Sequence, residues 1–166
     1  MKMSDGVEWS IHCVMLLGAL PPSATLSGKA LAEFHGIPES YLLKHLKMLV
    51  SNEILESVPG PRGGYRLARP PKDITLLDIV QAVDGKRPAF RCTEIRRRGP
   101  CGLDDSAYPR SCGINRAMMR AEQAYRDALA EETMKGITDA FMAGADPRIL
   151  PLGQSWLEEN TRTPKS

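Results

Sequence analysis

The stretch SGKALAEFHGIPESYLLKHLKMLVSNEILESVPGPRGGYRLA, residues 27–68, decides the fold. Apolar residues recur at helical spacing over 27–35 and again over 39–52, and a Gly-Ile-Pro break beginning at Gly36 separates the two runs. Two short helices joined by a glycine-containing turn are typical of a helix-turn-helix. The stretch therefore begins with a predicted helix-turn-helix.

A hairpin signal follows directly. Residues 54–58 and 65–68 are short strand-like runs, and the turn between them, residues 59–64, is rich in glycine and proline. A hairpin placed directly after a helix-turn-helix is a wing. The stretch as a whole therefore predicts a winged helix-turn-helix.

The flanking sequence supplies two more helices to this domain. Helical periodicity over 7–20 predicts a helix that Pro21 ends, and a second helix over 75–85 is expected to be capped at Thr75 and stopped at Gly85. Together these elements predict a DNA-binding domain over residues 1–85.

The rest of the chain divides into a loop, a long helix and a tail. Residues 86–112 lose all periodicity, so this loop needs something to order it. Residues 113–143 carry one apolar stripe with many small alanines, which predicts a helix that pairs with its copy in a homodimer. The tail, 144–166, is assigned no function. The fold class is mainly α, a winged helix-turn-helix with a two-stranded wing and a long C-terminal dimerisation helix.

Composition limits the classes of function that the chain can have. The 166 residues are 42% hydrophobic, and 22 basic residues nearly balance 20 acidic ones, so bulk charge alone does not indicate nucleic acid. No apolar run approaches the roughly 18 residues of a membrane span, and the beginning lacks a signal-peptide core. A cytoplasmic protein without a membrane partner is expected. Its four cysteines then indicate metal ligands, redox groups or small apolar residues rather than disulfides.

Candidate DNA-contacting residues come from the second helix of the motif and from the wing. In this motif that helix enters the major groove, so contacts to bases or phosphates are expected from Ser40, Tyr41, Lys44 and Lys47. Arg62 at the wing tip is placed to reach a minor groove. A dimer would present two such helices to a pseudo-palindromic operator in double-stranded DNA. The alternative is a winged protein-interaction module whose lysines are merely solvated.

Three cysteines in the loop form a candidate metal site. Eight residues separate Cys92 from Cys101 and ten separate Cys101 from Cys112. Thiolates suit iron-sulfur clusters or zinc, but the Cys-x-x-Cys knuckle of structural zinc sites is missing, so zinc is the runner-up. From spacing alone, an iron-sulfur cluster, zinc, and inert or redox-active thiols all stay open.

The first helix adds two further candidate ligands. Glu8 and His12 are four residues apart and project from one face, which suits two ligands on one metal. The alternative is a surface pair that stabilises the helix. Trp9, between them, is a candidate for coupling the site to redox state. Cys13 points elsewhere and is expected to be a buried small residue.

The order of elements, with the segments 63–67 (GGYRL) and 74–85 (ITLLDIVQAVDG), resembles the Rrf-type family of bacterial winged helix-turn-helix regulators over roughly residues 1–143. This family includes the IscR, NsrR and RsrR types. The residues around Glu8, Cys92 and Cys112 resemble the redox-sensing RsrR type most.

The resemblance implies a cofactor and its ligands. In that type, a 2Fe-2S cluster is held by two cysteines of one subunit and by a glutamate and a histidine of the other, which by position are Cys92 and Cys112, and Glu8 and His12. Replacing two thiolates by a carboxylate and an imidazole raises the cluster potential. The implied function is a redox-sensing transcription regulator. The alternatives are a 4Fe-4S nitric oxide sensor that also uses Cys101, and structural zinc.

An enzyme is the alternative from another class. Its nucleophile would be Cys13 or Cys101 and its base His12 or His45. The chain has no phosphate-binding glycine loop and no nucleophile elbow, and an enzyme would leave the wing and recognition helix without a role. The sequence therefore favours a regulator that is not an enzyme.

Overall fold

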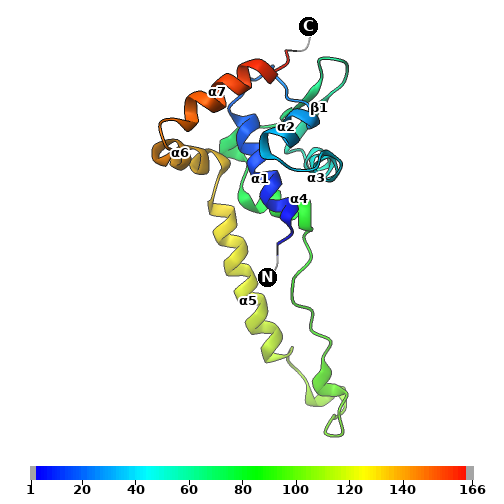
Figure 1. The fold of residues 1–166 in the computed structure, drawn as a ribbon. Coiled ribbons are helices and arrows are strands. Elements are labelled where there is room, and N and C mark those ends of the chain that lie inside the picture. Colours follow the sequence, from blue (N-terminus) through cyan, green and yellow to red (C-terminus); the bar gives the residue numbers. More distant parts are fainter. Residues whose placement is uncertain (1–2, 164–166) are drawn as a thin grey trace.

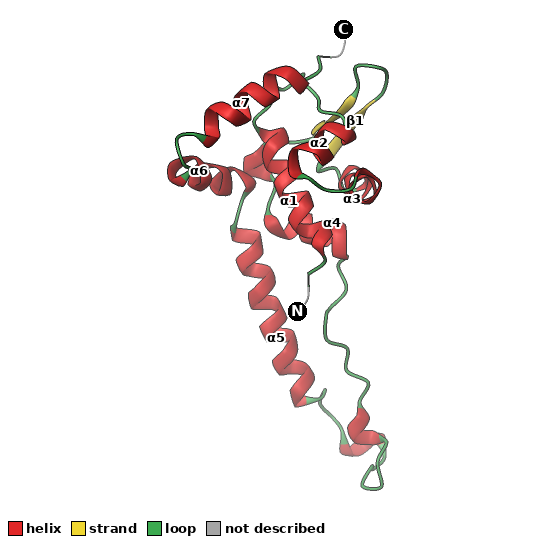
Figure 2. Ribbon diagram, viewed as in Figure 1, coloured by secondary structure: helices red, strands yellow, loops and turns green. Residues whose placement is uncertain are grey.

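A computed structural model describes residues 3–163, so the first two residues of the predicted domain and the last three of the tail lie outside the described residues. Figures 1 and 2 show a helical body, which holds the helix-turn-helix and the wing, and a long arm that projects from it. The elements in chain order are α1 (Asp5–Gly18), α2 (Gly28–His35), α3 (Glu39–Ser51), β1 (Leu55–Val58), β2 (Gly64–Leu67), α4 (Leu76–Asp84), α5 (Gly113–Glu131), α6 (Met134–Gly144) and α7 (Ile149–Asn160).

The predicted helix-turn-helix is confirmed as α2 and α3. The Ser27 side chain caps α2 by accepting a hydrogen bond from the Ala30 amide at 3.1 Å. Gly36 ends α2 with a φ of 64°, a left-handed conformation that glycine adopts without steric cost. Leucines of α3 at helical spacing point into the core and fix the angle of this helix.

The predicted wing is confirmed as an antiparallel hairpin of β1 and β2. Leu55 lies opposite Leu67 and Val58 lies opposite Gly64, with the turn between them at the wing tip. On the other edge of β2, Leu26 pairs with Tyr65, so the segment before α2 extends the small sheet.

Helix α4 follows the wing with the predicted cap. Thr75 accepts a hydrogen bond from the Asp78 amide and the Asp78 carboxylate accepts one from the Thr75 amide, which makes a complete capping box. Helix α4 packs against α1 and α3 and closes the core of the body. Fully buried members of that core are Leu26, Leu31, Leu42, Leu46, Leu49, Ile54, Ile74 and Ile79.

The prediction of one helix over residues 113–143 was wrong. Helix α5 ends at Glu131 and α6 begins at Met134, because the chain between them pairs with the segment before α4. The Leu76 amide donates to the Glu132 carbonyl at 2.9 Å and the Met134 amide donates to the Ile74 carbonyl at 2.8 Å. These bonds fold α6 back onto the body, so α5 alone forms the helix of the arm (Figure 1).

The tail contains an additional helix, α7, that the sequence analysis missed. Its Trp156 ring contacts the Phe34 ring of α2, with centroids 4.7 Å apart. Phe34 is 37% exposed beside this contact. Over residues 3–163, none of these helices combines the length and apolar character that a membrane span requires.

Candidate functional site

The structure places the predicted DNA-contacting residues on the surface of the body. Those on the recognition helix α3, all exposed, are Ser40, Tyr41, Lys44 and Lys47. Arg62 is exposed in the turn of the wing, and α3 packs directly against β1. Among residues 3–163, no carboxylate pairs with Lys44, Lys47 or Arg62, so their charges are available to an external anion.

Cys92 and Cys112 meet at the outer end of the arm. Cys112 is the residue that precedes the first turn of α5, and the Cys92 side chain lies beside it. The backbone amides of Asn115 and Ile114, in the first turn of α5, are the main reason why the pKa of Cys112 is lowered. The charge of Arg96 adds to this effect. The pair is therefore suited to supply thiolates.

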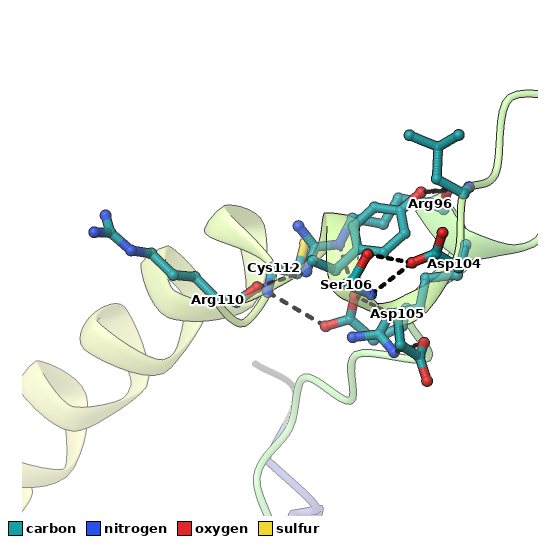
Figure 3. Close-up of polar contacts among 10 residues, drawn as sticks. Arg96, Asp104, Asp105, Ser106, Arg110 and Cys112 are labelled. Carbon is teal, nitrogen blue, oxygen red and sulfur yellow. Dashed lines mark hydrogen bonds and ion pairs between the residues drawn. The ribbon is translucent and has the colours of Figure 1, made fainter.

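Glu94 holds this loop in shape, a role that no sequence signal predicts. It has a left-handed φ of 51°, and its carboxylate accepts hydrogen bonds from Arg96 Nε at 2.7 Å and from the Cys112 amide at 3.3 Å. The Arg96 contact lowers the pKa of Glu94. Arg96 also donates to the Arg110 carbonyl at 2.8 Å and lies over the Tyr108 ring (Figure 3). Cys112 is thus fixed by a network of charged and aromatic side chains.

Cys101 lies in the tip of the arm and is exposed. The tip is held by polar contacts of its own: Arg97 pairs with Asp105 at 2.7 Å, and Ser106 hydrogen-bonds to Asp104 (Figure 3). Between residues 3 and 163, no three His, Cys, Asp or Glu side chains lie together as a metal site. One chain therefore does not assemble the three-thiolate arrangement considered for Cys92, Cys101 and Cys112.

The other two predicted ligands, Glu8 and His12, lie on the body. Both are exposed on α1, one turn apart, and the His12 ring lies 5.7 Å from the His35 ring of α2. Helix α1 belongs to the body, whereas α5, which begins directly after Cys112, starts in the outer part of the arm (Figure 1). The four predicted ligands thus lie in two separate pairs. A thiol pair in which Cys112 has a lowered pKa suits a soft metal or cluster, and the four predicted ligands do not meet within the described residues of one chain.

Trp9 connects α1 to the recognition helix. Its ring meets the His45 ring of α3 edge-on, with centroids 5.9 Å apart. Gly6 also lies against His45, so close that a β-carbon there would clash with the imidazole. Burial is the main cause that lowers the pKa of His45, followed by the charge of Lys44. A change in the position of α1 would therefore displace α3 through these contacts.

Cys13 is not suited to bind a metal or to act as a nucleophile. It is fully buried in the core, as expected, and burial raises the pKa of its thiol to about 12. A thiol in this state is protonated at neutral pH and serves neither as a nucleophile nor as a ready ligand.

Comparison with known sequences agrees with this arrangement. Residues 3–140 match the Rrf2 family, described as an iron-dependent transcriptional regulator. The HTH-type transcriptional regulator YwgB of Bacillus subtilis is 31% identical over 141 residues, which cover 84% of this chain and 85% of YwgB. The HTH-type transcriptional regulator NsrR of the same organism is 23% identical over 137 residues, covering 82% and 90% of the two chains.

Solved structures show the same fold. IscR of T. potens has a TM-score of 0.63 at 22% identity and covers 90% of this chain and 96% of its own. CymR, the global cysteine regulator of B. subtilis, has a TM-score of 0.62 at 19% identity, with 84% and 98% covered. The family model and the relatives found by sequence are transcriptional regulators, which argues against the enzyme alternative.

Proposed function

Because the chain belongs to the Rrf2 family of transcriptional regulators, we propose that it is a homodimeric DNA-binding regulator that senses redox state through a 2Fe-2S cluster. One observation carries this proposal: the chain presents a thiol pair on its arm and a carboxylate–imidazole pair on its body, at two separate places. Each pair is an incomplete site, and two copies of the chain can complete both.

The ligands would come from two protomers. Cys92 and Cys112 of one protomer, with Glu8 and His12 of the other, supply the four ligands that two irons need. When bound, the cluster supplies a one-electron couple whose potential is raised by carboxylate and imidazole ligation. The backbone amides at the start of α5 stabilise the Cys112 thiolate, and Glu94 fixes the backbone that carries it.

The dimer interface is the apolar stripe of α5. Ile114 is 67% exposed and Met118 is 42% exposed in the single chain, although both belong to the stripe that an isolated protein would hide. The alanines along the same stripe are also exposed and allow a second helix to approach closely. A second copy of α5 is therefore the occupant that fits this surface.

Coupling to DNA would pass through α1. Glu8 and His12 share this helix with Trp9, and Trp9 contacts His45 on the recognition helix. A change in the bond between these ligands and the cluster would shift α1 and so change the placement of α3, giving two states with different affinities for DNA.

The DNA contacts are proposed for both parts of the winged domain. Lys44 and Lys47, with Ser40 and Tyr41, would enter the major groove, and Arg62 would reach the adjacent minor groove. The two recognition helices of a dimer match a pseudo-palindromic operator. A cytoplasmic location, where such a regulator meets DNA, is part of this proposal.

The test is a metal count on protein purified without oxygen, for wild type, Cys101→Ala and His12→Ala. The expected result is about two irons and two sulfides per chain. Cys101→Ala should leave the count and the visible spectrum unchanged, whereas His12→Ala should alter both. About four irons, lost together with Cys101, would indicate the nitric oxide sensor instead, and colourless protein containing zinc would indicate a structural metal.

Redox control requires a second measurement. Affinity is measured for a duplex that the wild-type protein selects from a random-sequence pool, with the protein oxidised, reduced or cluster-free. Different affinities among these forms are expected. Equal affinities would show that the regulator does not respond through this site.

A further inference from the structure

The chain after α7 forms an antiparallel β-bridge with the segment that precedes α2. Arg162 pairs with Thr25 in both directions: its amide donates to the Thr25 carbonyl at 2.9 Å, and the Thr25 amide donates to the Arg162 carbonyl at 2.8 Å. On the next residue, Leu26 exchanges two hydrogen bonds with Tyr65 of β2, at 3.1 and 2.8 Å. Arg162 is therefore at the outer edge of a sheet that continues through residues 25–26 into the wing.

Side chains tie this edge to the wing turn itself. The Thr25 hydroxyl, which is buried, donates to the Arg62 carbonyl at 3.3 Å. Arg162 Nη1 donates to the Gly63 carbonyl at 3.5 Å, so its guanidinium lies beside the backbone that carries Arg62. The exposed Arg162 thus adds a second cation at the wing.

Helix α7 fixes the position of this segment. Trp156 packs against Phe34 of α2, and both Trp156 and Leu157 lie against the core of the body. The Thr161 amide donates to the Leu157 carbonyl at 2.9 Å, so the helix ends directly before Arg162. The segment reaches the wing from a packed helix rather than from a free tail (Figure 1).

The charge of Arg162 is not neutralised within the described part of the chain. No ion pair in residues 3–163 involves Arg162 or Arg62, whereas the exposed Arg148 at the other end of α7 pairs with Asp146 at 2.6 Å. Two unpaired guanidinium groups at one wing are suited to the DNA backbone, whose phosphates accept hydrogen bonds from arginine.

We propose that the segment 161–163 is part of the DNA-binding domain and that Arg162 binds a DNA phosphate beside the wing. The proposal does not depend on the cluster and rests only on DNA binding by the winged domain. Arg162 also lies beyond residues 3–140, the part that matches the family.

The test compares four substitutions in full-length protein: Arg162→Gln, Arg162→Lys, Arg62→Gln and, as the matched control, Arg148→Gln. Affinity for the duplex selected by wild type is measured at several salt concentrations. Loss of one phosphate contact should weaken binding about five- to tenfold at 0.1 M salt and lower the salt slope by about one per protomer. Arg162→Gln should show both effects, Arg162→Lys should retain the wild-type slope, and Arg148→Gln should match wild type.

Amide hydrogen exchange distinguishes the loss of the Arg162 charge from a loss of local structure. The Thr25 amide bonds to the backbone of residue 162, so it should stay as slow in Arg162→Gln as in wild type. A wild-type slope and affinity in Arg162→Gln would overturn the proposal, as would weaker binding with an unchanged slope. Wild-type protein that selects no duplex would overturn DNA binding itself, and this contact with it.

Discussion

At the scale of single residues, environment decides which thiol can do chemistry. Cys13 and Cys112 carry the same group, yet burial raises the pKa of Cys13 to about 12, whereas hydrogen bonds from the start of α5 lower that of Cys112. The difference lies in solvation and nearby amides rather than in sequence spacing.

Thiol labelling tests this contrast. In cluster-free protein at neutral pH, iodoacetamide should modify Cys101 and Cys112 in the folded state, and Cys13 only after unfolding in urea. Mass spectrometry of digested protein identifies the modified residues, and the urea-treated sample serves as the control in which all four react. Native modification of Cys13 at the rate of Cys101 would contradict its burial.

His45 gives the pH dependence of stability. Its pKa is lowered in the folded protein, mainly by burial and then by Lys44, against an opposite effect of Asp84. As the pH falls, His45 in the unfolded chain, where a histidine has a pKa of about 6.5, therefore binds a proton before His45 in the folded protein does. The free energy of unfolding should decrease as the pH falls below about 6.5.

Urea unfolding of the cluster-free protein on both sides of that pH measures this effect. The loss should be smaller in His45→Gln, while His35, whose pKa is lowered too, preserves part of it. An identical loss in wild type and His45→Gln would show that His45 does not contribute.

At the scale of elements, local sequence signals predicted the winged domain, but they did not predict where α5 ends or that α7 exists. Caps such as Ser27 and Thr75 act within one turn, so the sequence reveals them. The end of α5 depends instead on pairing between Thr75 and Thr133, 58 residues apart, which no local pattern contains. Helix α7 was missed because Pro151 and Gly153 suggest a loop, yet Pro151 lies in the first turn, where proline is tolerated.

The cap of α4 is open to a direct stability test. Thr75→Ala removes the side-chain acceptor for the Asp78 amide and should lower the free energy of unfolding by about 1 kcal/mol. Urea unfolding measures the change, and Thr93→Ala, an exposed threonine of the arm, is the control that should match wild type. Equal stability of Thr75→Ala and Thr93→Ala would mean that the capping box does not hold α4.

At the scale of the whole molecule, the role proposed for the arm requires a second copy of the chain. The sequence, with its family resemblance, led to four proposed ligands, but it could not show that one chain keeps these residues in two separate pairs, because that depends on how the arm leaves the body. The proposed dimer accounts both for the exposed apolar residues of α5 and for the separation of the four proposed ligands into two pairs.

Dimerisation through α5 predicts the effect of a single charge. Met118→Glu places a carboxylate on the apolar stripe and should yield a monomer that has lost its iron but keeps its helical circular dichroism. Gln123→Glu adds the same charge on the same helix, about 140° around it, and should stay dimeric. Light scattering gives the molar mass, and a dimeric Met118→Glu protein would contradict the proposed interface.

The most direct test of the shared cluster is complementation between two inactive variants. One variant carries Cys92→Ala and Cys112→Ala, the other carries Glu8→Ala and His12→Ala, and the two are co-expressed with different affinity tags. Neither homodimer should hold a cluster. The purified heterodimer should hold one, because the intact cysteines of one protomer meet the intact Glu8 and His12 of the other; a heterodimer without iron would show that the ligands do not come from two chains.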